Sequence, residues 1–328
     1  MQNEIKRDLY ATTILLMFLL TVNFVVWQMV KNNFHTKTKS DFEDSVFHLS
    51  KSIEQKFKNY TELLESGKHF YRSSNSVERG EFDGFYQESI SKNIAENQDI
   101  VMNTFVEITQ DKAELEKRVK DEANQFYYFS VYPDSNQKER YVINYIYPWE
   151  SNKRYFGYDM KTDPFFSSFF AQALEKGELV VTDPNVFVNI KRQLLIQPIY
   201  KNDTKTGLGF IVLFLDPDKM FDSIINDKDY ETMDLAIFNG DFSEEKIKDK
   251  QPVFLQKNID SGEKGTITKI EHFVIGNKPY TILARDVIFT SQNVFEKYFP
   301  DVNLIISNLV VIGFIVLLIH LKSVNGPS

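Results

Sequence analysis

Residues 9–30 read LYATTILLMFLLTVNFVVWQMV, a run of 22 positions without a charged side chain between Asp8 and Lys31. A second charge-free run of 20 positions, VNLIISNLVVIGFIVLLIHL, covers residues 302–321. A helix rises 1.5 Å per residue, so roughly 20 residues cross the ~30 Å hydrocarbon core of a bilayer. Each run is long enough to span a membrane once. We therefore expect both termini on one side of the membrane and residues 31–301 on the other.

Two other interpretations of these runs are less favoured. Residues 9–30 are too long for the apolar core of a signal peptide, and no small-residue cleavage site follows them. Residues 302–321 resemble a buried core helix in composition, but their richness in Ile and Val and their terminal position favour a membrane span. Aromatic residues flank the runs at Trp27, Tyr298 and Phe299, where membrane interfaces place them.

The flanking charges give a weak signal for orientation. Lys6 and Arg7 precede the first run, but three lysines follow it within nine residues, so the positive charges are nearly balanced. Long loops cross the membrane largely regardless of their charge. We therefore expect an inner or plasma membrane protein with two spans, with residues 31–301 periplasmic or extracellular. Residues 1–8 and 322–328 would then be cytoplasmic.

The composition excludes several classes of function. The formal net charge is −8, and clustered Lys and Arg, which nucleic-acid binding requires, do not occur. Cysteine is absent, which rules out disulfides, thiolate catalysis and cysteine-based zinc sites. With 26% charged and 42% hydrophobic residues, the chain between the runs has the composition of an ordinary globular protein.

The segment after the first run predicts a long amphipathic stalk helix over residues 31–75. Apolar side chains recur in it at spacings of three and four, at Phe42, Val46, Leu49, Ile53, Phe57, Tyr60 and Leu64. One interpretation is that this stripe packs on its own domain. The other, which is compatible with the first, is that it forms the seam of a homodimer.

The remainder predicts short helices and strands without regular β-α-β alternation, which is typical of an α+β fold with antiparallel sheets. Helices are expected after a Ser76 cap, over residues 111–124, from an Asp163 cap to Gly177, from Asp216-Pro217, and from about Gln292. Strands are expected over residues 100–108, 126–132, 140–147, 180–182, 193–200, 208–215 and several between 233 and 287, with a turn at Asn202–Gly207.

Six short segments, in order, resemble the CHASE domain, a sensor module outside the membrane in receptor histidine kinases and diguanylate cyclases. They are Ser73-Ser74-Asn75-Ser76-Val77-Glu78-Arg79 with Glu81-Phe82, Tyr145-Ile146-Tyr147-Pro148 with Asn152, Phe156-Gly157-Tyr158-Asp159, Ala171 to Gly177, Thr182 with Pro184, and Gln197-Pro198-Ile199-Tyr200 with Gly209-Phe210. The similarity extends over most of residues 40–290.

The resemblance implies a stalk helix followed by two PAS-like subdomains, and the ligand pocket would lie in the membrane-distal one. We place that subdomain at residues 76–216 and the membrane-proximal one at 217–291, with residues 292–321 forming a helix that leads into the second span. The family role implied is to bind a small molecule and pass the signal through the second span. An output kinase or cyclase domain, as in two-component systems, would receive it in cis or in trans.

Two positions depart from the cytokinin-binding plant members of the family. Phe166 stands where they carry Asp, and Ile196 where they carry Thr. Because a buried polar contact discriminates strongly between ligands, we expect a more apolar ligand than a cytokinin. The predicted lining is Tyr147, Phe166, Phe170, Thr182, Leu194, Ile196 and Gln197. Strand alternation allows only one of Ile196 and Gln197 to face inward, and simple core packing is the alternative for each aromatic residue.

No catalytic or metal-binding pattern stands out, so we expect no enzyme, metal or cofactor. The five histidines include no pair at i,i+4 spacing, and the segment Gly207-Leu-Gly209 lacks the rest of a phosphate loop. We expect Asp159 to fix a turn after Gly157; contact with a ligand is the alternative. A membrane-tethered enzyme and a structural dimeric anchor remain the alternative functions. Both a longer receptor and a short protein that signals through a partner are compatible with the sequence.

Overall fold

A computed structural model of the protein describes residues 2–74, 76–94, 99–122, 124–200, 207–225, 230, 233–247, 250–255, 267–276, 278–286 and 294–324. Most of the turn predicted at Asn202–Gly207, the predicted helix start at Gln292, Met1 and residues 325–328 lie outside the described residues. The chain divides into two compact units. One comprises residues 1–45, 261–268 and 285–328, and the other residues 46–260 and 269–284.

The first apolar run and the stalk form one continuous helix, α1 (Gln2–Ser73), of 72 residues. Nothing in its sequence interrupts it, because it contains no proline and Gly67 is its only glycine. The last helix, α8 (Val294–Val324), carries the second apolar run and includes Pro300. Segments Thr13–Asn33 and Pro300–Leu317 both have a mean hydropathy of 2.0, long and apolar enough to cross a membrane.

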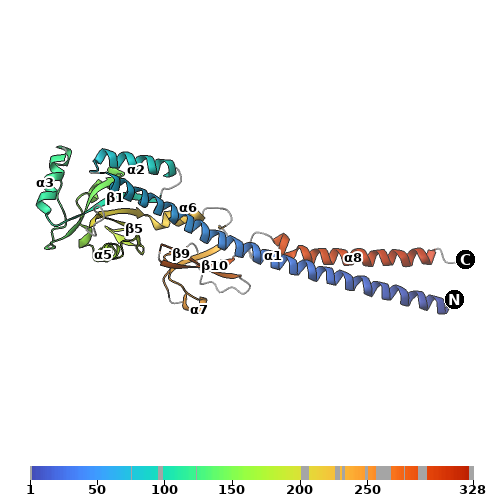
Figure 1. Ribbon diagram of the computed structural model, residues 1–328. Coiled ribbons are helices and arrows are strands. Elements are labelled where there is room, and N and C mark those ends of the chain that lie inside the picture. The colour runs from blue at the N-terminus through green and yellow to red at the C-terminus, as the bar shows by residue number, and fades with distance from the viewer. Residues whose placement is uncertain are drawn as a thin grey trace. The chain divides into compact units, whose positions relative to one another are not determined.

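Within the first unit, α1 and α8 lie side by side and share polar contacts (Figure 1). The side-chain amide of Asn23 donates to Ser307 Oγ at 2.7 Å and to Asn308 Oδ1 at 2.8 Å. The indole of Trp27 donates to Asp301 Oδ1 at 2.8 Å. These bonds join helices whose outer surfaces are otherwise apolar, and they set the register of one apolar helix against the other.

The larger sheet of the second unit contains β1 (Ile100–Thr109), β2 (Arg140–Tyr147), β3 (Val180–Val181), β4 (Asn185–Phe187), β5 (Ile190–Tyr200) and β6 (Gly207–Leu215). Its order is β2-β1-β6-β5-β3, and β4 pairs with β5. The neighbouring strands with assigned register pair antiparallel. The predicted α+β class with antiparallel sheets is therefore confirmed.

Different elements pack against the two faces of this sheet (Figure 1). One face packs against α1 and α2 (Arg79–Ile94), and Tyr71 of α1 stacks on Phe105 of β1 with ring centroids 4.4 Å apart. We call it the helix face. The opposite face, which we call the core face, contacts an apolar cluster whose members include Ile196 and Val212, a cross-strand pair.

Short helical segments enclose the core face. They are α3 (Lys112–Glu122), the 3₁₀ turn Asn124–Phe126, α4 (Trp149–Asn152), the 3₁₀ turns Lys153–Tyr155 and Met160–Thr162, and α5 (Phe166–Lys176). The predicted cap of α5 is confirmed, because Asp163 Oδ1 accepts from the backbone N–H groups of Phe165 and Phe166, each at 2.9 Å. Gly177 ends the helix with a φ of 70°, as predicted.

The smaller sheet, in the order β8-β7-β10-β9, contains β7 (Met233–Asn239), β8 (Phe254–Leu255), β9 (Thr268–Ile275) and β10 (Lys278–Asp286). It is preceded by α6 (Pro217–Ile225), and α7 (Glu244–Ile247) lies between β7 and β8. As predicted, Asp216 caps α6, since its carboxylate accepts from Lys219 N at 3.2 Å.

Two local predictions are wrong. Helix α2 begins at Arg79, so Ser76 is not its cap; the Glu81 carboxylate accepts instead from Glu78 N at 2.9 Å. Residues 126–132 form no strand. Phe126, Phe129 and Val131 are buried in the core cluster, and only Tyr132 forms an isolated bridge, to Tyr158. Burial of aromatic side chains produces the same apolar pattern that strand pairing would.

The apolar stripe of the stalk is buried within its own chain. All seven side chains, at Phe42, Val46, Leu49, Ile53, Phe57, Tyr60 and Leu64, expose 4% of their surface or less. The face of α1 that stays exposed between Lys51 and Lys58 is polar. This outcome agrees with the first of the two interpretations, packing of the stripe on its own domain.

Candidate functional site

Four of the seven predicted lining residues meet on the core face. Phe166 and Phe170 project from α5, Leu194 and Ile196 from β5, and all four belong to one apolar cluster with no exposed surface. Alternation along β5 places Leu194 and Ile196 on the same face of the sheet, the face that α5 covers. In this structure none of the four side chains is open to solvent. Whether they line a ligand pocket stays a prediction.

Thr182 is the fifth of these residues, and its polar groups are used by the sheet. Its hydroxyl accepts from Leu194 N at 2.9 Å, and its backbone N–H donates to Leu194 O at 2.9 Å. The side-chain amide of Gln193 donates to Thr182 O at 3.0 Å. These bonds extend the pairing of β3 beyond its last residue and fix the start of the loop that leads to β4.

The other two predicted residues, Gln197 and Tyr147, lie on the helix face. Gln197 is directly opposite Ile211, and its amide, oriented to satisfy its neighbours, donates to Glu65 Oε1 at 3.1 Å and accepts from Lys68 Nζ at 3.2 Å. Tyr147 is paired with Asn103, on the same face by alternation. Of the two residues between which the sequence left the choice open, Ile196 is therefore the one that faces the cluster.

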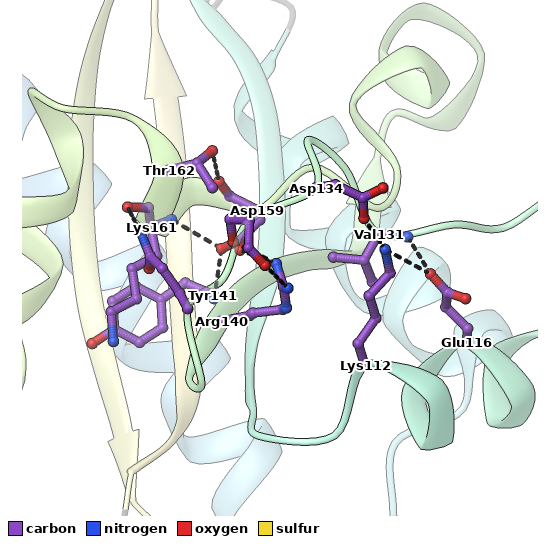
Figure 2. Close-up of polar contacts among 11 residues, drawn as sticks. Lys112, Glu116, Val131, Asp134, Arg140, Tyr141, Asp159, Lys161 and Thr162 are labelled. Atoms are coloured by element: carbon purple, nitrogen blue, oxygen red, sulfur yellow. Dashed lines mark hydrogen bonds and ion pairs between the residues drawn. The ribbon is translucent and has the colours of Figure 1, made fainter.

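Asp159 organises the turn at the edge of this cluster (Figure 2). Its carboxylate has no exposed surface, accepts from the backbone N–H groups of Tyr141 at 3.0 Å and Lys161 at 3.1 Å, and lies 3.2 Å from Arg140 Nη1. The hydroxyl of Thr162 donates to Asp159 O at 2.7 Å. The predicted role of Asp159 in fixing a turn is confirmed, and its lone pairs are occupied within the protein.

Gly157 allows the same turn to approach its neighbours closely. Its φ is 88°, and a Cβ atom there would lie 2.2 Å from Ser130 O. Its N–H donates to Ile143 O at 2.9 Å, and its carbonyl accepts from Tyr132 N at 3.0 Å. A side chain at this position would therefore break the contact between β2 and the segment around Tyr132.

A second set of contacts in Figure 2 attaches the segment at residues 131–134 to α3. Glu116 Oε1 accepts from Val131 N at 2.9 Å, and Lys112 forms an ion pair with Asp134. These two contacts with α3 hold the segment that carries buried Val131, although this segment forms no strand.

A surface groove of about 640 Å³ lies beside the cluster, outside α5. Its lining comprises Gln137, Lys138, Glu139, Tyr141, Lys161, Ser167, Ser168 and Ala171. Tyr141 lines this groove and also belongs to the apolar cluster, since its ring centroid lies 5.7 Å from that of Phe170 and 5.3 Å from that of Phe210.

Sequence reasoning missed Tyr141 and its neighbours. Burial, followed by the charge of Glu139, raises the pKa of the Tyr141 hydroxyl above its ordinary value. Lys161 Nζ lies 4.7 Å from the Tyr141 ring centroid and 2.6 Å from Glu139 Oε1. The alternation of residues 140–147 was the signal that could have found Tyr141, but it did not identify which element would cover that strand.

Among the described residues, no group of three His, Asp or Glu side chains could hold a metal ion. His272 Nδ1 lies 3.0 Å from Asp241 Oδ1, on the smaller sheet. What the core face offers is apolar and aromatic surface, which suits an apolar ligand group.

The family model of the CHASE domain matches residues 75–248. No curated protein matches the sequence. Among solved structures, an extracellular ligand-binding receptor from Desulfohalobium retbaense is similar with a TM-score of 0.49 at 10% identity, over 74% of this chain and 39% of that receptor. This chain therefore spans well under two thirds of that receptor's length.

Two further structures align over nearly their whole length. The ligand-binding domain of the Pseudomonas aeruginosa amino acid chemoreceptor PctC, in complex with GABA, has a TM-score of 0.44 at 10% identity, over 75% of this chain and 99% of that domain. The periplasmic sensory domain of the Campylobacter jejuni chemoreceptor Tlp1 has a TM-score of 0.41 at 12% identity, over 84% of this chain and 99% of that domain.

Proposed function

Because this chain belongs to the CHASE domain family, we propose that it binds a small apolar molecule at the core face and passes the signal to its second apolar helix. The family gives the chain its sensor role. The observation that carries the proposed site is the pair Phe166 and Ile196, two apolar side chains that face one buried cluster from α5 and β5. Each replaces a polar residue of the cytokinin-binding members.

An apolar ligand would be bound mainly by burial of its surface. Each Å² of apolar surface removed from water contributes about 25 cal/mol, so even a small ring can bind without charged partners. A ligand changes the conformation only if it binds two conformers with different affinities. The cluster is fully buried, so at least one of its side chains must move to admit a ligand, and the bound and unbound arrangements would differ.

The signal has a physical route from the larger sheet to the smaller one. Gln193 of β5, which donates to Thr182 O, also lies 3.5 Å from the hydroxyl of Tyr280 on β10. A Cβ atom on Gly276, in the turn before β10, would lie 3.4 Å from Val181 Cγ2 of β3. A shift of β3 and β5 would therefore be felt by β10, the last strand before α8.

The membrane arrangement and the partners belong to the same proposal. Segments Thr13–Asn33 and Pro300–Leu317 would cross the membrane, and residues 31–301 would lie outside the cytoplasm. The chain would act as a homodimer and without enzymatic activity of its own. A kinase or cyclase domain, in cis or in trans, would receive the signal. The dimer seam would use the exposed face of the stalk, because the apolar stripe is already buried.

The test is mass spectrometry of small molecules released from the full chain, purified from its native membrane, compared with the variant Ile196→Thr. We expect a molecule that the wild-type chain releases on denaturation and that the variant carries at a much lower level. Equal release from both proteins would place the bound molecule elsewhere. A product formed from the molecule during incubation with the wild-type chain would support a tethered enzyme instead.

A further inference from the structure

Phe187 packs into the core cluster from a short strand at one end of β5. It is the last residue of β4, yet it exposes only 1% of its surface. Its ring centroid lies 5.2 Å from that of Phe214, 5.3 Å from Tyr155, 5.4 Å from Tyr158 and 5.9 Å from Phe166. Four rings from three segments, namely β6, α5 and the turn that holds Tyr155 and Tyr158, therefore surround one side chain from a hairpin tip.

Besides Phe187, the hairpin is held at Lys191, whose Nζ lies 2.8 Å from Asp218 Oδ1 and donates to Val253 O at 3.3 Å. Strand β4 pairs only with β5, through Asn185↔Arg192, Val186↔Lys191 and Phe187↔Ile190. The side chains on either side of Phe187 are exposed, Val186 by 60% and Val188 by 46%. Moving the tip would leave the strand order β2-β1-β6-β5-β3 intact. The buried position of the tip therefore depends chiefly on the Phe187 ring.

The turn at this tip has an unfavourable backbone conformation. Val188 has a φ of 45° and Asn189 a φ of 68°. Asparagine tolerates the left-handed region, but a β-branched residue such as valine is a marked exception there. Strain of this kind persists only where surrounding contacts impose it. The two-residue turn that joins the paired residues Phe187 and Ile190 imposes it here, since hairpin turns of this length require a positive φ at both central residues.

Resting on the proposed function, we propose that Phe187 is a displaceable plug of the ligand site. The ligand carries a flat apolar ring that takes the position of the Phe187 ring, and the hairpin Asn185–Ile190 leaves the cluster when the ligand binds. Phe187 would thus set the size and shape of the ring that the site accepts.

The chemistry of the surrounding rings defines the ligand class. Tyr158 and Phe166 meet the Phe187 ring edge to face, at interplanar angles of 87° and 77°, an arrangement that aromatic pairs favour. The four surrounding side chains are two phenylalanines and two tyrosines. A phenyl-sized or indole-sized ring can reproduce these contacts, whereas a charged group would lose its hydration without gaining a partner.

Native-state thiol labelling tests the plug, since the chain has no cysteine of its own. The full chain in lipid nanodiscs is labelled with a maleimide as Phe187→Cys and, as the matched control, as Phe214→Cys, whose ring contacts Phe187 from the central strand β6. Local opening of the hairpin should make Cys at 187 react about a hundredfold faster than Cys at 214, which opens only with the sheet. Equal rates at the two positions would overturn the proposal.

A second measurement uses the wild-type chain and does not depend on the folding of the variants. With indole as the probe, hydrogen exchange should become faster over residues 185–190 and slower over residues 155–166, as the ring replaces Phe187. Slower exchange in both segments, or no change in either, would contradict the plug. A molecule bound at the core face without these changes would refute the plug and leave the sensor function standing. Fast labelling at position 187 in a chain that binds no small molecule would instead refute the sensor site.

Discussion

Lys278 Nζ lies 2.9 Å from Asp183 Oδ1, so the first residue of β10 is tied to the loop between β3 and β4. The side-chain amide of Asn239 donates to the same carboxylate oxygen. The Lys278 ammonium also lies 5.1 Å from the ring centroid of Phe169, on α5. One side chain of the smaller sheet therefore contacts both the helix and the loop that border the aromatic cluster.

Charge reversal tests this contact. Both side chains are partly exposed, so we expect Lys278→Asp alone to reduce the free energy of unfolding by only about 0.5–1 kcal/mol. The double variant Asp183→Lys with Lys278→Asp should recover part of that loss. Urea unfolding of the four proteins gives the interaction free energy as a double-mutant cycle. Strictly additive effects would show that the pair does not couple the two sheets.

Gly157→Ala should be strongly destabilising, because the new Cβ would meet Ser130 O and because φ is positive. We expect a loss of about 2 kcal/mol or more in the free energy of unfolding. Gly84→Ala is the matched control. Gly84 lies within α2 with open space around its Cα, so alanine there should stabilise the protein by up to about 1 kcal/mol. Similar effects of the two substitutions in urea unfolding would contradict the close approach at Gly157.

Asp159→Asn should cost about 3 kcal/mol of stability, because it leaves the nearly buried Arg140 guanidinium without its carboxylate partner. Adding Arg140→Met should recover part of this loss, since the unpaired charge is then removed. Asp134→Asn is the control at an exposed ion pair and should leave the unfolding midpoint unchanged within error. If Asp159→Asn behaves like Asp134→Asn, the buried carboxylate does not organise the turn.

Stability should fall at alkaline pH. Burial, and then the charge and hydrogen bond of Asp99, raise the pKa of the Tyr60 hydroxyl well above its ordinary value. The folded protein therefore keeps a proton that the unfolded chain loses above about pH 10, so stability is fully present below that pH and decreases above it. Each such tyrosine contributes a slope of at most about 1.4 kcal/mol per pH unit. Urea unfolding of Tyr60→Phe should show a shallower decrease, and an identical slope would contradict the assignment.

Cysteine cross-linking in membranes tests the homodimer. Single cysteines at Lys51, Gln55 and Lys58 lie on the exposed face of the stalk, whereas Ile53 and Phe57 are buried within the chain. We expect disulfide-linked dimers from the exposed set at helical spacing and much less from the buried pair. Absence of dimers at every exposed position would show that the stalk is not the seam.

The sequence predicted the features that depend on local patterns. Apolar length predicted the two terminal helices, and residue preferences placed the Asp163 and Gly177 ends of α5. The prediction over residues 126–132 failed because a buried irregular segment and a buried strand have the same apolar content. The predicted Ser76 cap was wrong because the carboxylate of Glu81, in the first turn of α2, accepts a hydrogen bond from Glu78 N instead.

The candidate site was predictable only in part, for a geometric reason. Alternation established that Ile196 and Gln197 face opposite ways, but it could not say which face α5 would cover and which α1 would cover. The burial of Phe187 was not predicted. Its strand has only three residues, and the four rings that surround it are distant from it in sequence.

The central claim is that the ligand binds on the core face of β5, and two adjacent residues test it most directly. Ile196→Thr changes that face, and Gln197→Met changes the helix face. The molecule released from the wild-type chain is titrated into the full-length wild type and both variants by calorimetry. The account predicts that Ile196→Thr weakens binding about tenfold or more, while Gln197→Met binds within about twofold of the wild type. Weaker binding by Gln197→Met together with unchanged binding by Ile196→Thr would contradict it.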